Sequence, residues 1–158
     1  MKRLAVIFYS RSGNTEKMAK LVADGAKGVS ETEVDVVRVD DIKPEKVLDY
    51  DGLIIGSPTY YGSMAGEIKK FFDETVKYHG KLDGKVGAAF SSAANIGGGN
   101  ETTISDILNA MLIHGMIVQG NPKGDHFGPV SIGAPDGRVQ EQCRELGQRV
   151  ASLLKRMG

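Results

Sequence analysis

The sequence predicts an α/β fold, a doubly wound five-stranded parallel sheet with helices on both faces. Two observations support this. Five runs rich in β-branched residues recur along the chain with helical patterns between them, and these runs are continuously apolar rather than alternating. Continuous apolar runs are typical of parallel strands that are covered on both faces. Strands that alternate with helices through right-handed crossovers give a doubly wound sheet, and with five strands we expect the order 2-1-3-4-5.

The predicted elements follow one another without a linker or repeat. The strands are expected at residues 4–9, 34–39, 53–55, 86–90 and 116–118. Apolar residues with helical spacing predict helices around residues 18–25, 64–76, 104–112 and 139–154. Between the second and third strands, Pro44 suits the first turn of a short helix. A chain of 158 residues of this kind is expected to form one domain, 1–158.

Composition excludes several classes of function. The 20 basic and 20 acidic residues cancel to a formal net charge of +0, which argues against a nucleic-acid partner or an anionic membrane. The apolar opening, residues 4–9, is too short for a signal peptide or a membrane span, so a cytoplasmic location is expected. The single cysteine, Cys143, is interpreted as an inert core thiol on the stripe of the last helix, and no metal site is expected.

The position of the polar loops predicts a ligand site. In a sheet of this order, ligands bind beyond the carboxyl ends of the strands, between the first and third strands, where the winding reverses. The loops after the first, third and fourth strands are unusual, and they read "SRSGNT", "GSPTYYGSM" and "SSAANIGGGNETT". A loop at the opposite edge, "GKLDGK", looks like a routine charged turn. The asymmetry between the two edges points to a ligand at the carboxyl edge.

The first of these loops has the character of a phosphate site. A helix N-terminus offers unpaired N–H groups and a positive dipole end, and the loop adds side-chain donors. Its residues are Ser10, Arg11, Ser12, Gly13, Asn14 and Thr15. The patterns of a Walker loop and of a dinucleotide-binding Rossmann loop are both absent. The alternative interpretation is an ordinary helix cap by Ser12, Asn14 or Thr15, with Arg11 solvated.

The other two loops offer groups suited to a flat ligand. Tyr60 and Tyr61 stand at the mouth of the site with rings that can stack, and the glycines of "IGGGN" bring backbone amides near a ligand. Each loop also has a structural explanation, since Pro58 can simply stiffen a turn, exposed tyrosines are common and glycine-rich loops can be merely mobile. Together, the three loops fit a ligand with one phosphate, a flexible polar tail and a large flat ring. Flavin mononucleotide (FMN) has these parts.

Several stretches resemble a known family. "YSRSGNTEKMAKLVADGA" is similar to the phosphate loop and first helix of flavodoxin-like proteins. "GSPTYYGSMAGEIKKFFDET", "GKVGAAFSSA", "GGGNETT", "HGMIV" and "FGPVSIGAPDG" resemble the NAD(P)H:quinone oxidoreductases of the Trp-repressor-binding-protein type. The resemblance covers nearly the whole chain. It implies FMN as the cofactor, NADH or NADPH as the electron donor, a quinone as the acceptor, and a homo-oligomer, either a dimer or a tetramer.

The resemblance also implies which residues form the site. It gives the FMN phosphate to the first loop, the isoalloxazine ring to the second, and the other edge of the ring to the third. The second and third sets are Pro58, Thr59, Tyr60, Tyr61, Gly62, Ser91, Ser92, Ala93, Asn95, Gly97, Gly98 and Gly99. His114 matches a histidine that in this family reaches the flavin site, often from a neighbouring subunit. His114 and Tyr61 are therefore the candidates to lend a proton or hydrogen bond, although His114 is equally well explained as a helix C-terminal residue.

The main prediction is an FMN-dependent reductase in which NAD(P)H delivers two electrons and leaves before the acceptor binds. The cofactor supplies the chemistry, while the protein supplies orientation and backbone amides. The alternative is a flavodoxin-type carrier that shuttles single electrons between proteins. The balanced charge argues against it, because such carriers use an acidic face to steer docking. A third interpretation is a flavin-binding redox sensor, for which the sequence names no target.

Overall fold

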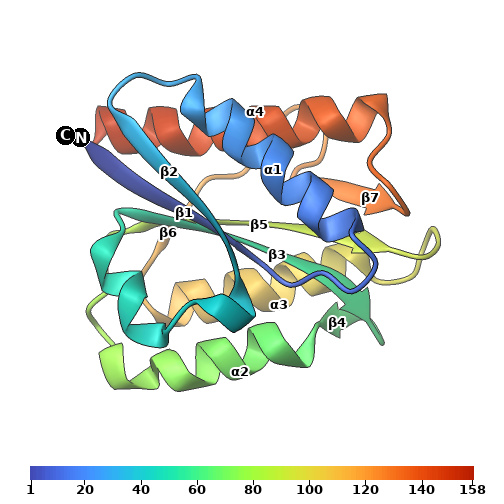
Figure 1. The fold of residues 1–158 in the computed structure, drawn as a ribbon, viewed down its shortest axis with the longest axis horizontal. Helices are drawn as coiled ribbons and strands as arrows, with labels where there is room; N and C mark the ends of the chain where they lie inside the picture. The colour runs from blue at the N-terminus through green and yellow to red at the C-terminus, as the bar shows by residue number, and fades with distance from the viewer.

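The computed structural model describes residues 1–158 and confirms the predicted doubly wound fold (Figure 1). The main strands are β1 (Lys2–Phe8), β2 (Thr32–Arg38), β3 (Gly52–Tyr60), β5 (Val86–Ala93) and β6 (Ile117–Val118). They lie in the order β2-β1-β3-β5-β6, and all neighbours along this path are parallel. Counting only these five strands, this is the predicted order 2-1-3-4-5.

Two short strands were not predicted, and both lie at the carboxyl edge. β4 (Ser63–Met64) folds back antiparallel on the end of β3, and β7 (Val130–Ile132) runs parallel to the end of β5. β3 is also longer than predicted, because residues 57 and 58 continue to pair with β5. These additions extend the sheet under the loops that follow β3 and β5.

The helices form one layer on each face of the sheet (Figure 1). α1 (Asn14–Lys27) and α4 (Gly137–Arg156) cover one face, and α2 (Gly66–Glu74) and α3 (Asn100–Ile113) cover the other. The link between β2 and β3 forms two 3-10 turns, η1 (Val39–Asp41) and η2 (Pro44–Asp49), and η3 (Thr75–Tyr78) extends α2. Pro44 begins η2, as predicted. None of the helices is long and apolar enough to cross a membrane.

The core explains why β1 is continuously apolar in sequence. Leu4 and Val6 pack on the α1–α4 side, whereas Ala5 and Ile7 pack on the α2–α3 side, and all four are fully buried. Each face of the strand therefore needs an apolar side chain. The strand thereby holds the start of the first polar loop rigidly at the carboxyl edge.

Helices α1 and α4 meet backbone to backbone at two glycines. A Cβ atom on Gly147 of α4 would overlap the carbonyl oxygen of Val22 in α1, and one on Gly25 of α1 would overlap the carbonyl oxygen of Arg144 in α4. Only glycine permits so close an approach without moving a helix. This contact fixes how α1, whose N-terminus faces the candidate site, sits on the sheet.

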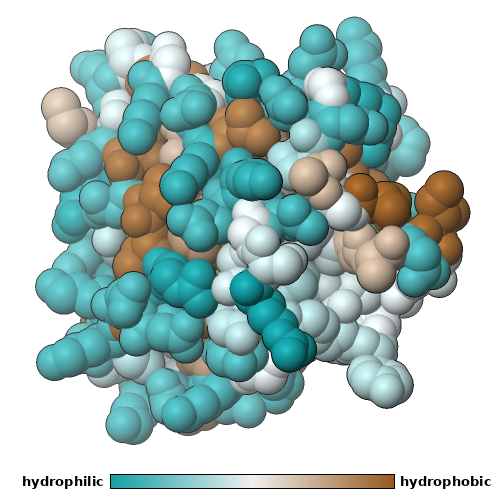
Figure 2. All heavy atoms as spheres, turned by 45° about the vertical axis from the view of Figure 1, so that its right-hand side comes forward, coloured by the Kyte–Doolittle hydropathy of each residue, from teal (hydrophilic) through white to brown (hydrophobic).

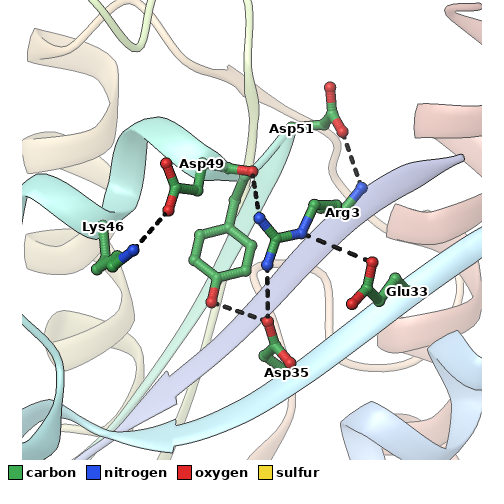
Figure 3. A network of polar contacts seen from close by, with 7 residues as sticks. Arg3, Glu33, Asp35, Lys46, Asp49 and Asp51 are labelled. Atoms are coloured by element: carbon green, nitrogen blue, oxygen red, sulfur yellow. Dashed lines mark hydrogen bonds and ion pairs between the residues drawn. The ribbon is translucent and has the colours of Figure 1, made fainter.

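A charged network ties the strands together on the α2 side of the amino edge (Figure 3). The backbone N–H of Arg3 donates to Asp51 at 2.8 Å, and its guanidinium donates to Asp35 at 3.4 Å while lying 5.0 Å from the ring centre of Tyr50. The hydroxyl of Tyr50 donates to the same carboxylate at 2.9 Å. Burial and the interaction with Asp35 raise the pKa of Tyr50 to about 12. The network is structural and lies at the edge opposite to the polar loops.

We expect Cys143 to be unreactive toward the thiol reagent DTNB while the protein is folded. Its side chain is fully buried in the α1–α4 side of the core, and burial raises the pKa of its thiol to about 12, so almost no thiolate is present near neutral pH. The measurement compares the reaction rate in native buffer with that in guanidinium chloride. Equal rates in the two conditions would show that the thiol is exposed and would contradict this expectation.

Candidate functional site

The three polar loops converge at the carboxyl edge, as the sequence predicts. Figure 1 shows the start of α1, the β4 turn and the loop after β5 at the same end of the strands. The side-chain oxygens of Thr15 and Ser92 lie 2.9 Å apart, which links the first loop to the third. Thr103, in the first turn of α3, donates to Thr59 at 3.1 Å, which links the third loop to the second. The loops therefore form one surface.

The first loop leaves the N-terminus of α1 open. Its N-cap residue is Gly13, with φ at +99°, and no side chain caps the helix. The interpretation of this loop as an ordinary cap by Ser12, Asn14 or Thr15 is therefore wrong. α4 shows the contrast, because there Asp136 accepts a hydrogen bond from the N–H of Val139 at 2.9 Å. The uncapped N–H groups and dipole of α1 remain available to an anion.

The side chains of the first loop divide into two groups. Ser10 and Thr15 are buried, and the hydroxyl oxygen of Ser10 accepts a hydrogen bond from the N–H of Gly13 at 3.1 Å. Arg11 and Ser12 are exposed, and Asn14 is partly exposed at the first residue of α1. The buried hydroxyls set the shape of the loop, while the exposed side chains and the open amides can reach a ligand.

The second loop separates the two tyrosines. Tyr61 is fully exposed and has a φ of +50°, which is unusual for a large side chain. Tyr60 is only partly exposed, packs edge-on against Tyr9 with ring centres 6.5 Å apart, and has a buried hydroxyl oxygen with no hydrogen-bond partner. Of the two, Tyr61 has the ring that is free to stack on a flat ligand. Thr59 and Pro58, both partly exposed, continue β3 toward it.

The third loop approaches the second through two glycines. Gly99, the N-cap of α3, has a φ of +109°, and a Cβ atom there would lie 2.6 Å from the Cα atom of Gly62. Gly97 is exposed with a φ of +72°, Gly98 is partly exposed, and Asn95 is exposed. The backbone of this loop is thus held close to the second loop with no side chain in between.

Three of the predicted residues in the third loop, Ser91, Ser92 and Ala93, are buried internal supports. Ser91 is fully buried, and its hydroxyl donates to the side-chain oxygen of Asn100 at 2.7 Å. Ala93 is also buried, at the end of β5. The sequence reasoning missed Asn100, whose side-chain amide also donates to the carbonyl of Ser131 in β7 at 3.2 Å. Asn100 belongs to the third polar loop, but its role depends on β7, which was not predicted.

His114 does not reach the loops of its own chain. It follows the last turn of α3, whose 14 residues put it about 20 Å from the loop that begins the helix. The hydroxyl of Thr75 donates to the carbonyl of Phe72 at 2.6 Å, so it accepts from Nε2 of His114, which lies 2.8 Å away. His114 therefore carries a proton on Nε2. A contact between His114 and a flavin would require the site of a second copy.

We expect His114 to make stability depend on pH. Burial, with a smaller contribution from His79, lowers the pKa of His114, whereas an unfolded histidine titrates near about 6.5. As the pH falls, the unfolded chain therefore binds the proton at a higher pH than the folded chain does. The contribution of His114 to the free energy of unfolding is fully present above about pH 6.5 and is lost as the pH drops through that value, by at most about 1.4 kcal/mol per pH unit. Urea unfolding at several pH values measures this slope. His114→Gln should flatten it, and parallel slopes in the two proteins would contradict the expectation.

The residues at this edge fit FMN. The open N-terminus of α1 suits a phosphate, the exposed ring of Tyr61 suits a flat ring system, and the glycine backbone of the third loop offers amides. Figure 2, in which the right-hand side of Figure 1 comes forward, shows residues of intermediate hydropathy gathered there beside an apolar margin. The doubly wound fold and the features of its carboxyl edge are those of a class of α/β proteins. Proteins of this class bind a phosphorylated ligand at the point where the winding of the sheet reverses.

Comparison with known proteins gives the family. The flavodoxin family model matches residues 6–112. The chain is 41% identical to a flavodoxin of Aquifex aeolicus, covering 96% of this chain and 86% of the relative, and 35% identical to an NAD(P)H dehydrogenase (quinone) of Archaeoglobus fulgidus, covering 99% and 100%. The chain belongs to the flavodoxin family, and its predicted resemblance to the quinone oxidoreductases is confirmed. Membership of this family implies FMN as the cofactor.

A solved structure shows the same fold over the whole length. The flavodoxin, WrbA-like protein from Agrobacterium tumefaciens superposes with a TM-score of 0.84 and 24% identity, covering 100% of both chains. A flavodoxin from the domain Archaea superposes with a TM-score of 0.78 and 28% identity, covering 97% of this chain and 99% of that one. By name, the relatives thus include both flavodoxins and NAD(P)H dehydrogenases (quinone).

Proposed function

We propose that the protein is an FMN-dependent oxidoreductase that takes two electrons from NADH or NADPH and passes them to a quinone. The observation that carries the proposal is the charge at the site. Arg38 stands at the loop end of the sheet, 3.5 Å from a carboxylate oxygen of Asp40, and the whole chain has a formal net charge of +0. A protein carrier needs a charged face to steer docking, whereas a small quinone does not. Quinone dehydrogenases that align along 99% of the chain support the same reading.

The residues of this chain bind and orient rather than react. FMN, when bound, supplies the electron transfer between nicotinamide and quinone. The N-terminus of α1 holds the phosphate, Tyr61 provides a stacking surface, and the amides of Gly97 and Gly99 provide donors for negative charge on the ring. A cavity of about 540 Å³ beside the third loop, between the starts of α3 and α4, gives room for a second ligand at the same edge. The phenol of Tyr61 is the one predicted proton donor on this edge of the chain, because His114 lies at the far end of α3.

A one-electron carrier is the second candidate, and the identity to the Aquifex aeolicus flavodoxin is the observation in its favour. The two functions differ in what reduces the bound flavin. A reductase accepts electrons from a nicotinamide directly, whereas a carrier needs a protein or another one-electron donor.

An anaerobic absorbance experiment separates them. FMN-loaded protein is mixed with NADH or NADPH, and benzoquinone is added after the trace is steady. We expect rapid bleaching by one nicotinamide and prompt recovery of the oxidised spectrum with the quinone. Bound FMN that neither nicotinamide reduces, but that one-electron donors do reduce, would contradict the reductase and favour the carrier. Free FMN at the same concentration is the control for direct reaction in solution.

A further inference from the structure

Arg38 is a charged residue beside the site that lies outside the three loops. It is the last residue of β2, next to β1 at the carboxyl edge. Its guanidinium lies 5.7 Å from the ring centres of both Phe8 and Tyr9, the two residues that lead into the first loop, and 3.5 Å from a carboxylate oxygen of Asp40. The aromatic rings and the carboxylate therefore fix where the arginine head group sits.

From this position Arg38 holds the first residue of the phosphate loop. Its Nη2 donates to the carbonyl oxygen of Ser10 at 3.1 Å, while the hydroxyl oxygen of Ser10 accepts from the N–H of Gly13. Just before it, the N–H of Tyr9 still donates to Gly56 of β3 at 3.2 Å. Ser10 is thus held through its carbonyl and through its side chain, and Arg38 supplies the contact to the carbonyl.

The contact sets the direction of the next amide. The chain has no cis peptide bond, and in a trans peptide the C=O and the following N–H point in opposite directions. Because the carbonyl of Ser10 points to Arg38, the N–H of Arg11 points away from Arg38 and from the β2 edge. β2 is the outer neighbour of β1, and the other two polar loops follow β3 and β5 on its other side. The direction of this amide is a property of the loop itself, present before any ligand binds.

We propose that Arg38 is a positioning residue that preforms the phosphate loop for FMN. The inference rests on the proposed binding of the FMN phosphate at the start of α1. Without the guanidinium, the Ser10–Arg11 peptide loses its only side-chain anchor from outside the loop and can rotate, so phosphate binding must also order the loop. A preformed loop avoids that cost, and the benefit applies to the phosphate and not to the flavin ring.

The test compares FMN with riboflavin, which has the same ring but no phosphate. Dissociation constants are measured by quenching of flavin fluorescence for the wild type, Arg38→Met and Arg38→Lys, at low salt and at about 1 M NaCl, where surface charges are screened. We expect Arg38→Met to weaken FMN binding by about tenfold or more at both salt concentrations, as for loss of a charge-assisted hydrogen bond. Riboflavin binding should change by less than about threefold. Arg38→Lys, which keeps a charged donor, should recover part of the loss.

Arg3→Met is the matched control. Arg3 also lies on the sheet and stacks on an aromatic ring, but it belongs to the network at the amino edge. Its removal should lower the urea midpoint and leave both flavin affinities unchanged. An equal loss of FMN affinity in Arg3→Met would show that general destabilisation, rather than the loop contact, is responsible, and would overturn the proposal.

The remaining outcomes are also decisive. Unchanged FMN affinity in Arg38→Met overturns the role of Arg38 while leaving the phosphate site intact. A loss that disappears at high salt indicates attraction by charge alone and overturns positioning. Loss of riboflavin binding along with FMN shows that the ring site has collapsed, and this too overturns it. A wild-type protein that binds FMN no tighter than riboflavin would instead refute the phosphate site, and with it the proposed function.

Discussion

Replacing Gly147 by leucine is expected to leave the protein largely unfolded in buffer. Gly147 is fixed in the middle of α4 with the carbonyl of Val22 directly against its Cα hydrogens, so any Cβ atom would overlap the backbone of α1. The helices cannot separate without exposing the core between them and the sheet. We expect the free energy of unfolding to fall by at least about 4 kcal/mol, which is close to the whole stability of many small domains. Urea unfolding followed by far-UV circular dichroism measures it.

Gly137→Leu is the matched control on the same helix. Gly137 is the first residue of α4, and a Cβ atom there meets nothing within 4 Å. The added side chain is the same, and both glycines lie in the helix, so the difference between the two variants isolates the contact with α1. The free energy of unfolding of the control should lie within about 1 kcal/mol of the wild-type value. Equal stability of the two variants would show that the helices do not touch at Gly147.

The second large effect is expected at the site itself. Gly99→Val should raise the dissociation constant for FMN by about a hundredfold or more, because the valine needs a φ of +109° that it tolerates poorly and would press on the backbone of Gly62. Either the second and third loops separate or the start of α3 shifts, and both changes spoil the surface that the ligand uses. Flavin fluorescence titration measures the affinity, and circular dichroism checks that the fold remains.

Gly80→Val separates backbone strain from loop contact. Gly80 also has a positive φ, +82°, but a Cβ atom there meets nothing within 4 Å, and it lies in a turn after η3 rather than in the three loops. Strain alone should lower stability by about 1–3 kcal/mol and leave FMN affinity unaltered. An affinity loss at Gly99 no larger than at Gly80 would mean that the close approach of the two loops does not matter for binding.

The fold could be predicted from the sequence because the residues of β1 indicate that both faces of this strand are buried. Both Leu4 and Ala5 point into a core, so the run has no polar alternation and can only belong to a strand covered on both faces. β7 could not be predicted in the same way. It has three residues, with Ser131 fully buried in the middle, and it exists because the end of β5 offers an open edge beyond the two residues that pair with β6.

The candidate site was predicted at the level of loops but not of individual roles. Loop polarity and glycine content located the edge, whereas the different exposure of Tyr60 and Tyr61 depends on Tyr9, which directly follows β1. Arg38 was missed because a basic residue at the end of a strand looks solvated in sequence. Its contact with Ser10 joins residues 28 positions apart. The role of His114 likewise follows from Thr75, which lies in η3 at the end of the neighbouring helix α2.

The central claim is that the carboxyl edge of this sheet binds FMN through its phosphate, and one titration tests it most directly. Apoprotein is titrated with FMN and, separately, with riboflavin, and quenching of flavin fluorescence gives affinity and stoichiometry. We expect one FMN per chain, bound about tenfold or more tighter than riboflavin, because riboflavin has no phosphate to bind at the open N-terminus of α1. Absence of binding, or equal affinity for the two flavins, would contradict it.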